Sequence, residues 1–468
     1  MQPREHALTL PARMVRVAVV APAERLRDVL VAVADSGTVD LAGTLPSPSG
    51  EALEALRRLE RSGGNGTPPA LVTRDRPDIA ELERLGAAGL LAGEVELARR
   101  SATAVGHGSF AAFVGWTPED ELPRLSERLV PLGAAAVELP RPAWPEPPTL
   151  IARRPAVKPF RPLVETFGPA PYADLDPTLF AAFSFVLMFG MMFGDVGHGL
   201  LLAGFGLALR FVRHGRLVAL RSIWPLPFAA GLSAALFGLA YGECFGPTGL
   251  VPRLWLDPVD DPGRLLAVAL AVGAALLTLS YAFGTVNRWR EQGAAAAIVS
   301  PTAIAGACVF LGAGIFAAGW YLDARPLALA GAVAAGVGLL LLVAGFALEA
   351  GRGAVAVLQV AVEAGDAIIR IATSTISFTR LGAFGLAHAA LGAMVWQAAG
   401  ALWGTAAGAI LAVLVFLAGN VLAFSLELLV AGIQSLRLEY YELFSRIFAR
   451  QGRAFAPWHI PLAGKEES

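Results

Sequence analysis

The chain has 468 residues and a formal net charge of −1; 55% of its residues are hydrophobic and only 16% are charged. A soluble domain has about 45–50% apolar and about 25% charged residues, so this composition does not fit a wholly soluble protein. The balanced charge argues against nucleic acid as a partner. Two cysteines, Cys244 and Cys308, indicate neither a disulfide framework nor a metal site.

Residues 1–140 are predicted to form a small cytoplasmic α/β domain. Its start, MQPREHALTLPARMVRVAVV, lacks the uninterrupted apolar core of a signal peptide. Residue types and periodicity predict strands at 14–21, 38–43, 109–116 and 134–139, and helices at 23–37, 49–62, 77–104 and 119–132. The cluster SGGNGTPP separates the two middle helices. The Pro-rich residues 141–177 are predicted to be a linker on a membrane surface.

Residues 178–448 are predicted to form an α-helical polytopic membrane domain. Apolar runs recur there at about 20 residues, the length that crosses a hydrocarbon core. About eight segments are expected, at 178–191, 194–213, 222–241, 264–285, 296–319, 327–350, 361–398 and 403–448. The last two are longer than a span needs, so each is expected to be tilted or to extend into the cytoplasm.

Loop charges predict the orientation of the chain. Residues 210–221, 287–291 and 436–453 are basic, whereas residues 257–262 are acidic. Lys and Arg accumulate on the cytoplasmic side of membranes. With eight crossings, all three basic stretches and both termini fall on that side, and residues 449–468 form a cytoplasmic tail.

Segment seven carries ionisable groups in a stretch that is expected to lie within the lipid bilayer. A charge at mid-bilayer costs at least about 2.5–3.5 kcal/mol, so such groups normally face protein, water or each other. At about 100° per residue, one stripe is predicted along this helix, and it contains Asp366, Arg370, Thr373, Ser377, Arg380, Phe384 and His388, with Glu363 one turn before it.

Segment eight offers partners for this stripe. Glu427 and Gln434 are seven residues apart and nearly superpose in helical projection, and Arg437 lies about 60° from Gln434. If the two helices pack together, Arg380 and Arg437 can approach one polar slot with Gln434 as a neutral hydrogen-bond partner.

Structural explanations compete with functional ones for most of these groups. Thr373, Ser377 and Asn420 fit interhelical contacts, and Arg370 and Glu439 fit snorkelling to the interface. Glu363, Asp366 and Glu427 are equally explained as partners of an arginine, and His388 as a core hydrogen-bonding group. Asp195 and His198, three residues apart in FGDVGHG, are interpreted as a structural polar pair, because a metal site needs more ligands than these two.

Several long blocks carry a family resemblance. They are PPTLIARRPAVKPFRPLVETFGPAPYADLDPT (147–178), FVLMFGMMFGDVGHGLLL (185–202), FGLAYGECFG (237–246), STISFTRLGAFGLAHAAL (374–391) and residues 426–458. In this order they resemble the membrane stator subunit of V-type and archaeal A-type ATPases, called subunit a or subunit I, the 116 kDa subunit family. Residues 14–42 also resemble the family's opening strand–helix–strand.

The resemblance implies a role for each matching residue. Arg380 corresponds to the essential arginine, Arg437 to the second arginine and Gln434 to the polar position beside it. The implied ion-path positions are Glu427 and His388, with the acidic positions Glu363 and Asp366 before the arginine. The implied partners are a rotating proteolipid c/K ring, peripheral stalk subunits of E/G type and, indirectly, the central stalk and the soluble ATPase head, in a prokaryotic plasma membrane. No cofactor is implied.

One feature departs from the family pattern, and two other functions stay open. The family's cytoplasmic arm is usually much longer, with extended helical hairpins, whereas only about 140 residues precede the linker here; a shortened arm is expected. No GxxxxGK[ST] motif occurs, so the chain is expected to be a non-catalytic subunit without an ATP site. The alternatives are a secondary transporter with broken helices and an inactive structural stator paralogue.

Overall fold

The computed structural model describes residues 11–61, 69–140, 146–150, 157–213, 215–448, 450 and 452–463. The first ten residues, most of the SGGNGTPP cluster, parts of the predicted linker (141–145 and 151–156) and parts of the predicted tail (449, 451 and 464–468) lie outside the described residues. The chain divides into two compact units. We call residues 11–152, 170–172 and 452–468 the sheet unit, and residues 153–169 and 173–451 the helical unit.

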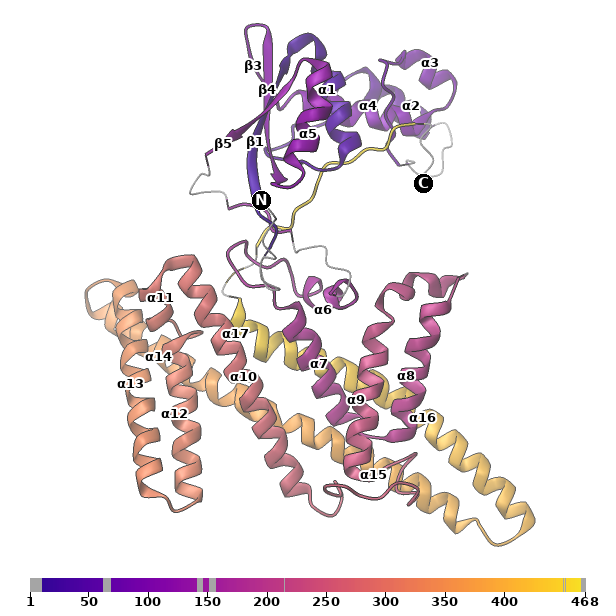
Figure 1. Cartoon of the computed structure of the whole chain (residues 1–468), viewed down its shortest axis with the longest axis vertical. Helices are drawn as coiled ribbons and strands as arrows, with labels where there is room; N and C mark the ends of the chain where they lie inside the picture. Colours follow the sequence, from indigo (N-terminus) through magenta and orange to yellow (C-terminus); the bar gives the residue numbers. More distant parts are fainter. Residues whose placement is uncertain are drawn as a thin grey trace. The chain divides into compact units, whose positions relative to one another are not determined.

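An antiparallel sheet organises the sheet unit (Figure 1). Its strand order is β2-β4-β1-β5, with β3 paired to β4. The central strands β1 (Met14–Pro22) and β4 (Phe110–Pro118) pair along their whole length, from Met14 opposite Pro118 to Pro22 opposite Phe110. The remaining strands are β2 (Asp40–Leu41), β3 (Val105–His107) and β5 (Ala135–Leu139). The predicted α/β character of this region is confirmed.

Helices complete the sheet unit. They are η1 (Ala23–Arg25), α1 (Leu26–Ser36), α2 (Glu51–Arg61), α3 (Ile79–Arg84), α4 (Ala88–Ser101), α5 (Leu122–Leu129) and η2 (Val130–Leu132). Gly37 ends α1 in the left-handed conformation, with φ of 57°, as its position predicted. The single helix predicted at 77–104 is wrong, because Gly86, with φ of 66°, separates α3 from α4.

Residues near the C-terminus belong to the core of the sheet unit. Trp458, Ile460 and Leu462 are buried in one cluster with side chains of β1 and α1. Backbone bridges join Val72 to Leu462 and Thr149 to Ala454. Arg453 Nη2 donates to Asp40 Oδ2 over 2.7 Å. The predicted tail is therefore partly a structural element of the sheet unit.

The helical unit begins with η3 (Lys158–Phe160) and α6 (Arg161–Glu165), and apolar helices follow. These are α7 (Thr178–Met192), α8 (Val196–Phe211), η4 (Arg216–Ile223), α9 (Pro225–Tyr241), α10 (Pro262–Gln292), α11 (Ala294–Val299), α12 (Ile304–Tyr321), α13 (Arg325–Ala350), α14 (Ala354–Ser377), α15 (Thr379–Ala401), α16 (Ala406–Leu438), η5 (Glu439–Phe444) and α17 (Ser445–Ile447).

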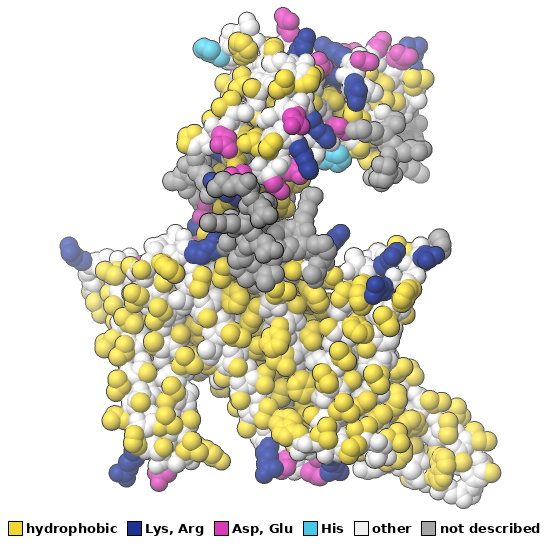
Figure 2. All heavy atoms as spheres, in the orientation of Figure 1, with side chains coloured by type: hydrophobic (Ala, Val, Ile, Leu, Met, Phe, Trp, Pro, Cys, Tyr) yellow, Lys and Arg dark blue, Asp and Glu magenta, His cyan; other side chains and the backbone are white. Residues whose placement is uncertain are grey.

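The expected count of about eight spans is not confirmed. Among the described residues, four helical stretches are long and apolar enough to cross a membrane, at Pro262–Gln292, Ala294–Tyr321, Arg325–Ala350 and Ala406–Ile447. A fifth results if Leu217–Ile223 and Pro225–Tyr241, which meet at 64°, form one broken span. The helices α7 and α8 have only 15 and 16 residues. Hydrophobic side chains cover the visible face of this unit and charged ones gather at its ends (Figure 2), as in an integral membrane protein.

The segment predicted at 361–398 is two helices. Phe378 separates α14 from α15, and its fully buried ring fills the space beside Gly273 on α10. The continuous polar stripe is therefore wrong, because Asp366 and Arg370 precede this break and are exposed, whereas His388 follows it and is buried. In Figure 1, α15 and α16 run obliquely across α7, α9 and α10.

Candidate functional site

Asp195 anchors one side of a buried polar cluster. It caps the N-terminus of α8, where its Oδ1 accepts the His198 backbone N–H over 2.8 Å. Its Oδ2 accepts the Gly246 backbone N–H over 2.9 Å. The loop after α9 can turn toward this carboxylate because Phe245 and Gly246 both have positive φ, 53° and 89°. Asp195, which is fully buried, thus ties that loop to the start of α8.

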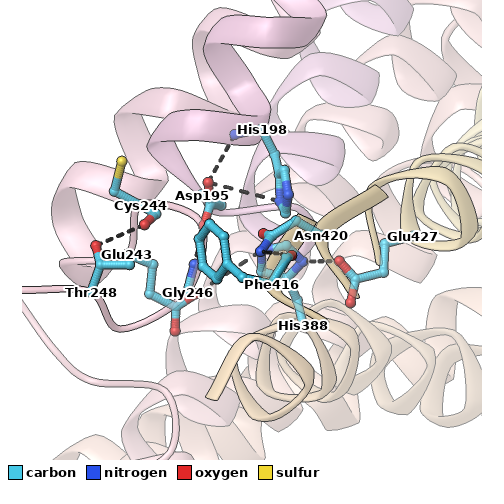
Figure 3. A network of polar contacts seen from close by, with 10 residues as sticks. All are labelled: Asp195, His198, Glu243, Cys244, Gly246, Thr248, His388, Phe416, Asn420 and Glu427. Atoms are coloured by element: carbon cyan, nitrogen blue, oxygen red, sulfur yellow. Dashed lines mark hydrogen bonds and ion pairs between the residues drawn. The ribbon is translucent and has the colours of Figure 1, made fainter. Parts of the chain in front are cut away.

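His388 supplies the other side of the cluster from α15. Its Nδ1 contacts a carboxylate oxygen of Glu427 on α16, and its Nε2 lies 4.0 Å from Glu243 Oε2. The rings of His198 and His388 have centroids 5.8 Å apart. These side chains come from the start of α8, from α15 and α16, and from the loop after α9, and Figure 3 shows them converging. We call Asp195, His198, Glu243, His388 and Glu427 the buried polar cluster.

Arg380 lies nearer the start of α15, next to α16. Its Nη1 donates to Gln434 Oε1 over 3.4 Å, while the Arg437 side chain is exposed one turn further along α16. Arg380 is half-buried, and it lines a surface hollow of about 290 Å³ together with Thr373, Ile376, Ser377 and Thr379. The structure thus brings Arg380 and Gln434 together and leaves both arginines accessible from outside the chain.

The two acidic positions on α14 lie apart from both groups. Asp366 pairs with Arg370 one turn later, and Glu363 accepts a hydrogen bond from Gln359 over 2.9 Å. Both carboxylates border a cavity of about 140 Å³ that Pro301, Thr302 and Arg446 also line. Of the predicted site residues, the structure therefore joins His388 with Glu427, Asp195 with His198, and Arg380 with Gln434, but neither α14 carboxylate with Arg380.

Two buried glutamates were not singled out for a site. Glu243 lies in the block FGLAYGECFG, where an acidic residue in an apolar stretch was the available signal. Glu439 was expected to snorkel to an interface, and this is wrong, because its side chain is fully buried and its Oε2 accepts the Ser184 hydroxyl over 2.6 Å. Glu439 is the first residue of the π-helical turn Glu439–Phe444, a kind of turn that often occurs at functional sites.

Comparison with known proteins shows which family this chain resembles. The V-type ATPase 116kDa subunit family matches residues 106–233. The A-type ATP synthase subunit I of Pyrococcus horikoshii is 28% identical over 362 residues, which cover 74% of this chain and 53% of the relative. That of Archaeoglobus fulgidus is 29% identical over 401 residues, with coverage of 74% and 58%. These matches confirm the resemblance to this family that the sequence blocks predicted.

A eukaryotic member of the 116 kDa subunit family gives a shorter match. The human V-type proton ATPase 116 kDa subunit a 3 is 32% identical over 154 residues, which cover 30% of this chain and 19% of the relative. The chain spans about half the length of the archaeal relatives that it matches. The range that matches the 116kDa subunit family, 106–233, contains Asp195 and His198.

Proposed function

We propose that the chain is the stator subunit of the membrane sector of a rotary V/A-type ATPase. In this role it provides Arg380 and two half-channels for moving protons or sodium ions against a ring of proteolipids. The observation that carries the proposal is the position of Arg380, half-buried on α15 and 3.4 Å from Gln434 on α16. The printed names of the relatives, A-type ATP synthase subunit I and V-type proton ATPase subunit a, support it.

The exposed surface of α16 supports a helical or lipid neighbour beside this arginine. Only 11% of the most apolar stretch within Ala406–Ile447 is buried inside the chain. Large apolar side chains, among them Leu426, Leu429 and Ile433, are exposed on α16. An apolar surface of this kind suits the outer face of a membrane-embedded ring, with Arg380 at its edge.

The proposed mechanism follows from desolvation and Coulomb attraction. A ring carboxylate that faces lipid stays neutral with its ion bound, since a bare charge there is costly. Arginine stays protonated in proteins. A loaded carboxylate that reaches Arg380 meets this positive charge, which favours the ionised form, so its ion leaves. The bare carboxylate then moves on and reloads, and Arg380 blocks a direct leak between the two half-channels.

The half-channels would use the remaining polar groups. His388 and Glu427 are in contact in the buried polar cluster, and Glu363 and Asp366 border a separate cavity. Arg437 is exposed near Arg380 and would add positive charge to the same face. We propose the buried cluster and the α14 cavity as parts of two ion paths on either side of Arg380, with peripheral stalk subunits holding the chain still.

Replacing Arg380 tests this function. In complexes reconstituted into vesicles, Arg380→Ala should abolish ATP-driven ion pumping while the complex still assembles. Arg380→Lys should also be poor, because a compact ammonium lacks the planar fork of arginine and loses its proton more readily when buried. Arg325→Ala, at the exposed start of α13, is the matched control and should pump normally. Coupled pumping by Arg380→Ala would exclude the proposed role.

Co-purification separates the alternatives. A stator should isolate with a ring of small proteolipids and a soluble ATPase head. A secondary transporter, which the bent pair Leu217–Ile223 and Pro225–Tyr241 would suit, should transport as a lone protein. An inactive structural paralogue should bind the ring, and its complexes should be indifferent to Arg380→Ala.

A further inference from the structure

We infer that the buried polar cluster is a binding site for a divalent transition-metal cation of the zinc type. Asp195, His198 and His388 would each give one ligand atom, and Glu243 would give the fourth. From the sequence, Asp195 and His198 alone were too few for a metal site. The fold adds His388 from α15 and Glu243 from the loop after α9, 190 and 45 residues away from His198 in the chain.

The first step is the proximity of the donor atoms. One ligand atom each from Asp195, His198 and His388 lies within 4.8 Å of the others, and all three residues are buried. Glu243 Oε2 lies 4.0 Å from His388 Nε2, and Glu243 is 5% exposed. Zinc holds nitrogen and oxygen ligands at about 2.0–2.2 Å, so binding requires side-chain movements on the order of 1 Å.

The second step is the orientation of His388. Because Glu427 contacts Nδ1, the proton of a neutral imidazole belongs on that nitrogen, and the lone pair of Nε2 faces Glu243. A carboxylate behind a histidine fixes its tautomer and raises its basicity in metal sites. Asp195 is held in a similar way, by the backbone N–H groups of His198 and Gly246.

The third step is an unsatisfied imidazole. His198 is 3% exposed, and neither of its ring nitrogens has a hydrogen-bond partner within the described part of the chain. Its Nδ1 lies 3.8 Å from Asp195 Oδ1, too far for a hydrogen bond. Burying polar nitrogens without partners costs free energy. A cation bound between His198, Asp195 and His388 would form a ligand bond to one of the two ring nitrogens of His198.

The donor set selects the class of cation. Two imidazoles and two carboxylates suit zinc or its divalent transition-metal neighbours, whereas calcium and magnesium prefer sites built from oxygen ligands. A bound ion would join α8, α15 and the loop after α9. It would also occupy His388 Nε2, so it should inhibit any ion movement that uses this histidine.

Metal binding to the full chain in lipid nanodiscs tests the site without the ATPase complex. Titration with zinc chloride should show one tight site. Cobalt(II) should give the intense visible absorption of a four-coordinate ion. His198→Gln and His388→Gln should each weaken zinc binding at least tenfold. Glu427→Gln, which removes the charge behind His388, should weaken it about 10–100-fold. His107→Gln, at an exposed position on β3, is the matched control and should bind as the parent does.

The outcomes are distinguishable from those of the proposed function. Zinc binding that is unchanged in both His198→Gln and His388→Gln, or a six-coordinate cobalt spectrum, overturns the site even if Arg380 is essential for pumping. If either variant fails to fold, electron paramagnetic resonance of copper(II) in the parent chain decides instead. Coupling to two imidazole nitrogens supports the site, and coupling to none or one rejects it.

Discussion

Glu427 on α16 contacts the Nδ1 nitrogen of His388 on α15, so an imidazole buried in the helical unit has an acidic partner on a neighbouring helix. Glu243 approaches the opposite nitrogen from a third part of the chain. The two long helices α15 and α16 are therefore joined at two polar points, His388 with Glu427 and Arg380 with Gln434. The first of these is mostly buried, with side-chain exposures of 6% and 18%, and the second is open to the outside.

The pair of His388 and Glu427 should be strongly coupled. A double-mutant cycle with His388→Ala and Glu427→Ala should give an interaction free energy of about 0.5–3 kcal/mol, because the two side chains are in direct contact. Denaturation in mixed micelles, followed by circular dichroism, measures each variant. A cycle of His107→Ala with Glu427→Ala is the control and should be additive within about 0.5 kcal/mol. Additivity of both cycles would contradict the contact.

The close approach of α8 and α9 depends on glycine. A Cβ atom at Gly231 would lie 2.4 Å from the backbone nitrogen of Ala203 and 2.5 Å from the carbonyl oxygen of Gly199. Gly231→Ala should therefore force the helices apart and destabilise the helical unit by about 1–3 kcal/mol. Gly204→Ala makes the same change on α8 where nothing lies within 4 Å. It should be neutral or stabilising, and the same denaturation experiment compares the two.

Trp458 should be important for the sheet unit although it follows α17, the last described helix of the helical unit, in the sequence. Its side chain is buried with Ile460 and Leu462, and the Arg100 guanidinium lies 5.4 Å from its ring centroid. Trp458→Ala should lower the free energy of unfolding of this unit by about 3–5 kcal/mol. Amide hydrogen exchange of β1 and β4 in the full chain measures this loss. Trp403→Ala, at an exposed position, should leave that exchange unchanged.

Asp40 should make the stability of the sheet unit depend on pH. Burial raises the pKa of Asp40 above its ordinary value of 3.8, and Arg453 only partly opposes this shift. The folded state therefore holds the proton more tightly. The contribution of Asp40 to stability is complete below its unfolded pKa and is lost as the pH rises through the folded pKa. Hydrogen exchange of β1 at a series of pH values should show that stability falls less steeply in Asp40→Asn. Asp120→Asn, at an exposed position, should keep the parent slope.

Local sequence signals were enough for much of the fold. The periodic apolar runs predicted α7, α9 and α13 to within three residues at either end. The β-branched run at 14–21 predicted β1. These elements depend on residue type and on spacing over a few residues, and hydrophobic periodicity in the sequence is a direct signal of both. The break at Phe378 does not, because it accompanies packing of that ring against Gly273, more than 100 residues earlier.

The polar contacts also divide into those that the local sequence predicts and those that it does not. Helical projection predicted that Gln434 could meet Arg380, because both lie in long segments expected to pack together. In the structure, Arg380 Nη1 lies 3.4 Å from Gln434 Oε1. The approach of Glu243 to His388 joins residues 145 positions apart through a loop in which several residues, Phe245 and Gly246 among them, have positive φ angles. The apolar stretch around Glu243 marks it as unusual in the sequence. No spacing rule covers its contact with His388, so that contact could be found only in three dimensions.

The bridge between Thr149 and Ala454 has a consequence for how the protein is made. The chain leaves the sheet unit before α7 and returns to it after α17. In a membrane, this arrangement would require the chain to come back to the side from which it departed, and hence an even number of crossings. During synthesis, β1 and β4 emerge first, yet their core lacks Trp458, Ile460 and Leu462 until the ribosome has passed the whole helical unit. Completion of the sheet unit therefore requires that every helix of the helical unit has been made. A chain interrupted in any of these helices leaves an open apolar surface for quality control to detect.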